Sequence, residues 1–226
     1  MKFPQIITNF KAYDSGFGDD AKRMAKIHEK VAHETGVSIG IAVSAIDLKE
    51  IVALVDIPVF VQHIDAIRSG KGTGSVLPEA VKHAGAYGTL LNHSEKRLPR
   101  ETLKLAIERA KEVGLHCVVC VESSEEAAII MEYDPEMVAV EPPELIGGDI
   151  SVSAASPEII DRSVKIVGHG KLIVGAGIKD QTDVKIACEL GAYGILVASG
   201  VMQAKHPEEA LRALAMGIKA AEANPY

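Results

Sequence analysis

Short apolar segments rich in β-branched residues recur along the chain at nearly even spacing, and this repetition constrains the fold more than any other feature. Each is followed by a stretch whose apolar residues have helical spacing. The eight apolar segments cover residues 5–10, 37–43, 57–62, 86–91, 115–121, 137–140, 171–174 and 193–197. The helical stretches cover residues 19–34, 45–55, 76–84, 100–113, 124–133, 156–167, 180–190 and 207–223. Strand and helix are therefore expected to alternate throughout.

The ends of several expected helices carry a glycine, after which the next apolar segment begins almost at once. These glycines are Gly36, Gly85, Gly114 and Gly191. Glycine adopts the left-handed conformation that ends a helix without a steric penalty. The glycines thus support the predicted boundaries between helix and strand.

This alternation also predicts how the strands pair. Nearly continuous apolar strands joined by helices pair in parallel, because each crossover returns the chain to the same end of the sheet. Eight such units favour a closed barrel over an open, doubly wound sheet. We therefore predict an α/β fold, a compact (β/α)8 TIM barrel, as a single domain over residues 1–226. Such barrels typically take ~250 residues, so this chain of 226 residues is expected to have short helices and loops.

Charge and hydropathy exclude several classes of partner. The net charge is −7 and no basic block occurs, whereas a nucleic-acid-binding protein normally carries a stripe of lysine and arginine that contacts phosphates. No apolar run is long enough to cross a bilayer, and the first residues do not resemble a secretion signal. We therefore expect a cytoplasmic protein without a nucleic-acid or membrane partner.

The cysteines and histidines do not suggest disulfides or a metal. Three cysteines, Cys117, Cys120 and Cys188, are an odd number in a chain without secretory features, which argues against a disulfide framework. Cys117 and Cys120 lie in one apolar strand and are predicted to point to opposite faces as core residues. The eight histidines lack the paired spacing of a metal site, so no metal is expected.

Residues suited to proton transfer stand where three of the expected strands end. Asn9 and Lys11 end the first strand, His93 follows the fourth, and Glu141 follows the sixth. Active sites of such barrels lie at the carboxyl ends of the strands, so these side chains are expected to converge. Taken singly, a histidine in this position is more often structural, and a lysine is often a solvated charge. Their joint occurrence at three strand ends favours a catalytic site.

Three segments resemble the triosephosphate isomerase family in residue type, order and spacing: 9–11, 93–97 and 141–148. The resemblance runs from the first strand to the last helix and is strongest to the short archaeal-type members. It implies an isomerase that interconverts dihydroxyacetone phosphate and D-glyceraldehyde 3-phosphate through an enediolate, in glycolysis and gluconeogenesis. It also implies that no cofactor is needed.

The resemblance assigns a role to each residue of the cluster. Glu141 is expected to remove the proton, and His93, as a neutral imidazole, to polarise the carbonyl group. Lys11 is expected to supply a fixed positive charge and Asn9 a hydrogen-bond donor. Glu95 is the carboxylate expected to hold Lys11 in place. The family is a standard example of pKa tuning and loop closure.

A phosphate site is implied at the ends of the seventh and eighth strands. The residues expected there are Gly175, Gly177, Ala198 and Ser199, together with backbone groups of Ile146 and Gly147. The chain departs from the family here, because the serine found in many seventh-strand loops is absent from residues 175–178. Residues 175–180 resemble a dinucleotide-binding loop only superficially, since Asp180 stands where the third glycine belongs.

Two further segments are assigned by resemblance. Residues 142–151 are expected to form a lid, with prolines at one hinge and Gly147 and Gly148 at the tip. Gln62, His63 and the loop 69–74 are expected to serve packing and an interface, with Thr73 entering a neighbouring subunit. A homo-oligomer is expected, with a tetramer favoured over a dimer.

Two other functions stay open on the sequence alone. One is a phosphate-binding barrel aldolase that forms a Schiff base through Lys11, although such aldolases usually carry the reactive lysine on a later strand. The other is a sensor or scaffold that binds the triose phosphate without turnover. No catalytic group of the family is missing, which favours the isomerase over the sensor.

Overall fold

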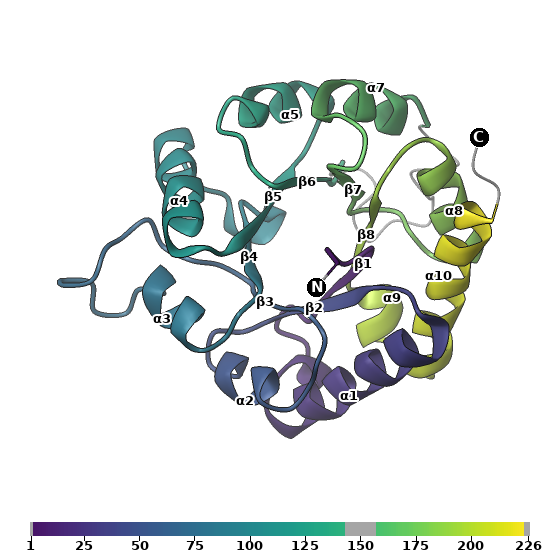
Figure 1. The fold of residues 1–226 in the computed structure, drawn as a ribbon, viewed down its shortest axis with the longest axis horizontal. Helices are drawn as coiled ribbons and strands as arrows, with labels where there is room; N and C mark the ends of the chain where they lie inside the picture. Colours follow the sequence, from purple (N-terminus) through teal and green to yellow (C-terminus); the bar gives the residue numbers. More distant parts are fainter. Residues whose placement is uncertain (1, 143–156, 224–226) are drawn as a thin grey trace.

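Eight parallel strands form a closed barrel in strict chain order, as Figure 1 shows. The computed structural model describes residues 2–142 and 157–223. The strands are β1 (Ile6–Asn9), β2 (Ile39–Val43), β3 (Val59–Val61), β4 (Gly88–Leu91), β5 (His116–Val121), β6 (Met137–Val140), β7 (Leu172–Val174) and β8 (Gly194–Val197). Strands β1 and β8 pair in parallel and close the ring. The predicted TIM barrel is thus confirmed.

The helices surround this barrel (Figure 1). They are α1 (Gly18–Thr35), α2 (Leu48–Val52), α3 (Pro78–His83), α4 (Arg100–Val113), α5 (Ser124–Met131), α7 (Pro157–Val167), α8 (Gln181–Glu189), α9 (Ser199–Met202) and α10 (Pro207–Glu222). Two 3-10 helices, η1 (Asp14–Gly16) and η2 (Ser94–Lys96), follow β1 and β4. Gly36 and Gly114 have positive φ angles of 70° and 74° and cap α1 and α4, as predicted.

Three helical segments differ from the sequence-based prediction. Helix α2 has five residues, although the segment 45–55 was expected to be helical. Helix α3 begins at Pro78, two residues later than expected, because proline is favoured in the first turn, where its missing N–H is not needed. Helix α9 was not predicted, since its four residues are too short to show a helical period.

Alternating residues of the strands build two apolar cores. One set fills the barrel interior and includes Ile7, Phe60, Leu90, Ile173 and Leu196. The other set faces the helices. Cys117 belongs to the outer core and Cys120 to the interior, so the prediction that they point to opposite faces is confirmed.

An aromatic cluster fills the amino-terminal end of the barrel. The ring of Phe3 packs edge-on against those of Phe60, Tyr87, His116 and Tyr193, with centroid distances between 5.9 and 6.1 Å. The imidazole of His116 also stacks on Tyr87 at 4.1 Å. This end is therefore filled by packed rings, whereas polar side chains collect at the carboxyl ends of the strands.

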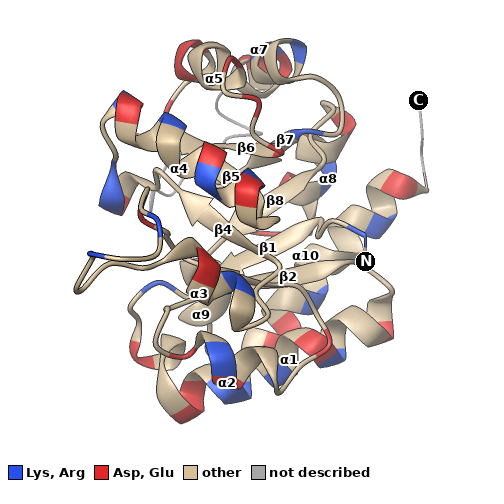
Figure 2. Ribbon diagram, turned by 60° about the vertical axis from the view of Figure 1, so that its left-hand side comes forward, with Lys and Arg blue, Asp and Glu red and all other residues tan. Residues whose placement is uncertain are grey.

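The outer surface carries interspersed charges of both signs (Figure 2). Many belong to ion pairs, such as Lys30 with Glu208 at 2.8 Å, which links α1 to α10. Exposed pairs of this kind each stabilise a fold by about 1 kcal/mol or less. No helix within residues 2–142 and 157–223 is both long enough and apolar enough to span a membrane.

Candidate active site

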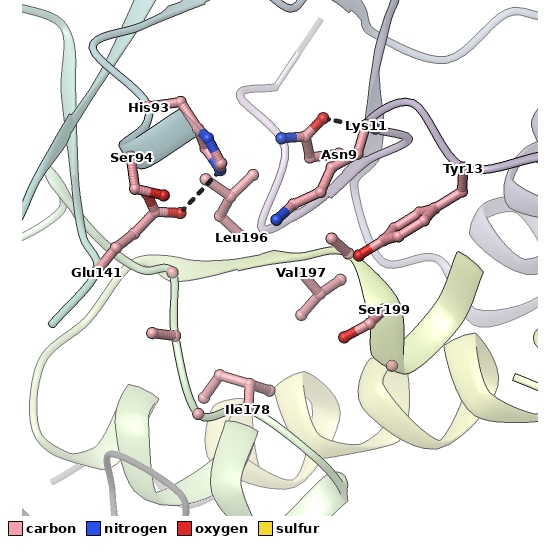
Figure 3. A pocket seen from close by; sticks show the side chains of 15 residues that line it. Asn9, Lys11, Tyr13, His93, Ser94, Glu141, Ile178, Leu196, Val197 and Ser199 are labelled. Carbon is pink, nitrogen blue, oxygen red and sulfur yellow. Dashed lines mark hydrogen bonds and ion pairs between the residues drawn. The ribbon is translucent and has the colours of Figure 1, made fainter. Parts of the chain in front are cut away.

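A cavity of about 130 Å³ opens at the carboxyl ends of the strands (Figure 3). It lies between the ends of β1, β4 and β6 on one side and those of β7 and β8 on the other. Its lining residues are Asn9, Lys11, Tyr13, His93, Ser94, Glu141, Gly175, Ala176, Gly177, Ile178, Leu196, Val197, Ala198, Ser199 and Gly200. Four strand-end side chains singled out from the sequence, Asn9, Lys11, His93 and Glu141, thus border a single space.

Glu141 follows β6 directly and is 5% exposed. Burial raises the pKa of its carboxyl group to about 7, although the neighbouring Cys120 thiol and the Lys11 ammonium group favour the ionised form. Its Oε2 atom is buried and has no hydrogen-bond partner among the described residues. A carboxylate with so little solvation and a pKa near neutrality is suited to accept a proton.

Gly175 makes room for this carboxylate. A Cβ atom at this position would lie 2.5 Å from Cγ of Glu141 and 2.9 Å from its Oε1. Both distances are too short for any residue with a side chain. The close approach therefore requires glycine at the end of β7.

His93 caps the amino-terminal end of the 3-10 helix η2. Its Nδ1 atom accepts a hydrogen bond from the backbone N–H of Glu95 at 3.2 Å. In the neutral ring the proton must then sit on Nε2, which lies 3.8 Å from Oε1 of Glu141. Burial, followed by the charge of Lys11, lowers the pKa of His93. The cavity therefore receives a neutral imidazole with its N–H directed towards Glu141.

Lys11 brings a positive charge to the same space, and two amides hold its backbone. Its Nζ atom pairs with Oε1 of Glu95 at 2.9 Å. The backbone of Lys11 has a positive φ of 48°, and its N–H donates to Oδ1 of Asn9 at 3.0 Å. Gln62 donates from Nε2 to Lys11 O at 3.0 Å and to Asn9 Oδ1 at 3.2 Å. Asn9 thus turns its amide nitrogen towards the cavity (Figure 3).

Gln62 and Cys120 contact residues of the cavity, and neither contact was predicted from the sequence. Gln62 was expected to serve packing, yet its amide bonds both Asn9 and Lys11. Cys120 was expected to be a core residue, and it is one, but its thiol also lies beside Glu141. No sequence signal distinguishes these roles, because both depend on which strands are neighbours.

The opposite wall of the cavity consists mainly of backbone at the ends of β7 and β8. Gly175 and Gly177 come from the first of these ends, and Ala198 and Ser199 from the second. Tyr13, also missed, directs its hydroxyl group towards this wall near Ser199 (Figure 3). Its position two residues after Lys11 was the available signal.

Some expectations concern residues that the structure does not describe. Ile146, Gly147 and the lid from 143 to 151 fall outside the described ranges. Within 2–142 and 157–223, no group of three histidine, cysteine, aspartate or glutamate side chains is placed to hold a metal ion.

Comparison with known proteins relates this chain to one family. The family model for triosephosphate isomerase matches residues 4–214. A protein of Methanocaldococcus jannaschii named triosephosphate isomerase is 45% identical over 213 residues, covering 92% of this chain and 97% of that protein. Proteins of the same name from Methanopyrus kandleri and Metallosphaera sedula are 44% and 45% identical. They cover 97% and 93% of this chain, and 100% and 94% of their own lengths, respectively. The chain belongs to the triosephosphate isomerase family.

Proposed function

We propose that this isomerase interconverts dihydroxyacetone phosphate and D-glyceraldehyde 3-phosphate with Glu141 as the base and His93 as the proton donor. One observation carries the assignment of these roles. A buried carboxyl group with a pKa of about 7 lies 3.8 Å from a neutral imidazole in one cavity. A substrate carbon and its carbonyl oxygen, placed between them, would meet an acceptor and a donor at once.

The reaction begins when the Glu141 carboxylate removes a proton from the carbon next to the carbonyl group. The electron pair of the broken C–H bond forms the carbon–carbon double bond of an enediolate, and negative charge collects on the oxygen. Glu141 then returns the proton to the neighbouring carbon, so the reaction consumes no net proton. Burial of Glu141 supports this role, because a desolvated carboxylate is a stronger base.

His93 and Lys11 stabilise the charge that develops. The Nε2–H of His93 donates to the carbonyl oxygen and can protonate it, and the proton then moves between the two oxygens. A neutral imidazole suits this exchange because it can both donate and accept. The Lys11 ammonium group, held by Glu95, supplies positive charge at the same place.

The phosphate group occupies the wall formed by Gly175, Gly177, Ala198 and Ser199. Backbone N–H groups at the ends of the last two strands commonly bind phosphate in such barrels. The hydroxyl group of Ser199 and the ammonium group of Lys11 border the same cavity. In this arrangement the phosphate anchors the substrate while its carbonyl end lies between His93 and Glu141.

A homo-oligomer is also proposed, with a tetramer favoured over a dimer. The loop between β3 and α3 projects from the barrel (Figure 1), and its residues 68–75, including Thr73, are exposed. A second cavity borders Lys11 and is lined by Ile46, whose side chain is 91% exposed. Insertion of Thr73 into this cavity of a second copy would cover both features. Sedimentation analysis of the wild type and of Thr73→Arg tests this, and an unchanged mass in Thr73→Arg would contradict it.

Cytoplasmic location is proposed for the same enzyme, because its substrates are phosphorylated metabolites of the cell interior. The test is a fractionation of the source cells with an antibody against this chain. Recovery in the membrane or secreted fraction would contradict the proposal.

A coupled assay of glyceraldehyde 3-phosphate conversion tests the proposed reaction. Purified wild-type protein is expected to isomerise the substrate, and Glu141→Gln to lose most of this activity. Borohydride trapping in the presence of substrate identifies the alternative, a Schiff-base aldolase, through a covalent adduct on Lys11. Binding of substrate without turnover would instead identify a sensor.

A further inference from the structure

The residue before His93 has an unusual backbone conformation. Asn92 connects β4 to His93, is 2% exposed and has a positive φ of 60°. Few residues other than glycine adopt this left-handed conformation, and asparagine is the commonest exception because its short amide can bond locally. The turn that aims His93 therefore depends on the residue type at position 92.

The side-chain amide of Asn92 joins three separate segments. Its Nδ2 donates to the carbonyl oxygen of Cys120 in β5 at 2.9 Å. 

Nδ2 of Asn92 also donates to Oε1 of Glu126 in α5 at 3.4 Å. In the other direction, Oδ1 of Asn92 accepts from the backbone N–H of Leu98 at 3.0 Å. The amide thus forms hydrogen bonds with strand β5, with helix α5 and with the segment between η2 and α4. Each of these bonds would be lost with a glycine or an alanine.

Arg97 closes the network around the same turn. Its Nη1 donates to the carbonyl oxygen of Asn92 at 3.3 Å, and its Nη2 pairs with Glu126. The second carboxylate oxygen of Glu126 accepts from the backbone N–H of Glu122 at 2.7 Å. His93 is therefore preceded by a residue whose backbone and side chain are both held, and it is followed by the η2 turn.

This network bonds the turn before His93 to β5, the strand whose Cys120 lies beside Glu141. The carbonyl group bonded by Asn92 belongs to Cys120, whose thiol lies beside the Glu141 carboxyl group. Asn92 itself does not line the catalytic cavity. It is therefore placed to fix the separation between His93 and Glu141 without touching the substrate.

We infer that Asn92 is a positioning residue that holds His93 at its working distance from Glu141, an inference that rests on the proposed isomerase function. Displacing a reacting group by about 1 Å lowers a rate on the order of 100-fold, while substrate binding by other groups persists. Loss of the Asn92 amide should therefore lower kcat and leave KM nearly unchanged. It should also change the environment of the His93 ring.

Asn92→Gly is the main test, because glycine keeps the left-handed backbone and removes only the side-chain bonds. We expect kcat to fall roughly 10- to 100-fold, with KM within about twofold of the wild type. Histidine NMR, assigned with His93→Gln, should show the titration of His93 shifted in the variant. Asn92→Asp is the second variant, since it keeps the shape and the acceptor for Leu98 but cannot donate to Cys120.

Asp134→Gly is the matched control. Asp134 also has a positive φ, 51°, but it lies in the loop between α5 and β6, outside the catalytic cavity. Its substitution should leave kcat and the His93 titration unchanged. The inference is overturned if Asn92→Gly, or Asn92→Asp where the glycine variant does not fold, matches this control in both measurements. An inactive wild type would instead overturn the proposed function, so the two failures are distinguishable.

Discussion

The two ends of the barrel each hold a histidine, in opposite surroundings. At the amino-terminal end, His116 stacks on Tyr87 and pairs with Glu136. At the carboxyl end, His93 is half-buried beside Glu141, whose Oε2 has no hydrogen-bond partner among the described residues. The histidine at the amino-terminal end thus has a carboxylate partner, whereas the cavity at the carboxyl end leaves a carboxyl oxygen unsatisfied. An unsatisfied buried carboxyl oxygen costs stability, so its presence in the cavity at the carboxyl ends of the strands indicates where function is located.

The largest expected effect is that of Glu141→Gln, which removes the base and conserves its volume. General-base groups typically contribute about 10²- to 10⁴-fold, so kcat should fall within that range while the fold is retained. Steady-state kinetics and circular dichroism measure the two properties. Glu136→Gln, at the opposite end, is the control and should keep wild-type kcat. Near-normal turnover in Glu141→Gln would remove Glu141 from its proposed role.

His93→Gln should have the next largest effect. Loss of a group that stabilises developing negative charge typically costs about 10²- to 10³-fold in kcat. KM should change little, because the interaction strengthens only during the reaction. His116→Gln should instead leave kcat unchanged. A comparable loss of kcat in both histidine variants would show that the two ends do not differ as proposed.

The stability of the fold should depend on pH through Glu141. Its pKa is raised from 4.5 to about 7 by burial, so the folded state binds more protons than the unfolded state between these values. Stability contributed by the protonated carboxyl group is therefore lost as pH rises from about 4.5 to 7. The fully buried His28, whose pKa is lowered to about 4, has the opposite effect. The stability that its neutral ring contributes to the fold is lost as pH falls from 6.5 to 4.

Denaturant unfolding at several pH values separates these two groups. The difference in the free energy of unfolding between Glu141→Gln and the wild type should change in favour of the variant as pH rises from 4.5 to 7. The reason is that the glutamine side chain cannot ionise. His28→Gln, by comparison, should lose less free energy of unfolding than the wild type as pH falls from 6.5 to 4. An identical pH profile for the wild type and Glu141→Gln would contradict the raised pKa.

Phe3→Ala tests the amino-terminal end. Phe3 packs against four rings but is only partly buried, so the loss should be about 2 kcal/mol, below the range for a fully buried phenylalanine. Urea unfolding measures this loss, and kcat below the unfolding transition should remain close to that of the wild type. A selective fall in kcat without a loss of stability would contradict the separation between the two ends.

Much of the fold was predictable because the apolar residues of its strands and helices recur at regular spacing along the sequence. Eight apolar segments in alternation with helices predicted the barrel, and the rule that active sites lie at strand ends predicted that Asn9, Lys11, His93 and Glu141 would meet. Helix α9 was missed because four residues show no period. The catalytic roles of these residues stay predictions.

Contacts between neighbouring strands were not predictable in the same way. Cys120 pairs in register with Ala139 of β6, two residues before Glu141, and this register brings its thiol to the carboxyl group. The amide of Gln62 could equally have faced solvent or a helix. For Asn92 a weak signal existed, because asparagine tolerates a positive φ, but only the structure shows its three bonded segments.

Tyr13→Phe should have the smallest effect and tests the wall of the cavity opposite Glu141. The hydroxyl group of Tyr13 points towards the region near Ser199 (Figure 3), where the phosphate group is proposed to bind. A neutral hydrogen bond contributes about 0.5–1.5 kcal/mol, so KM for glyceraldehyde 3-phosphate should rise roughly two- to tenfold with kcat nearly unchanged.

Comparison with a substrate that lacks phosphate decides whether this effect comes from the phosphate group. The kcat/KM of Tyr13→Phe for glyceraldehyde should equal that of the wild type, and inhibition by 2-phosphoglycolate should weaken as KM rises. Tyr133→Phe, which removes a hydroxyl group outside the cavity, is the matched control. Equal losses with both substrates would mean that Tyr13 supports the β1 end of the cavity as a whole and does not contact the phosphate group.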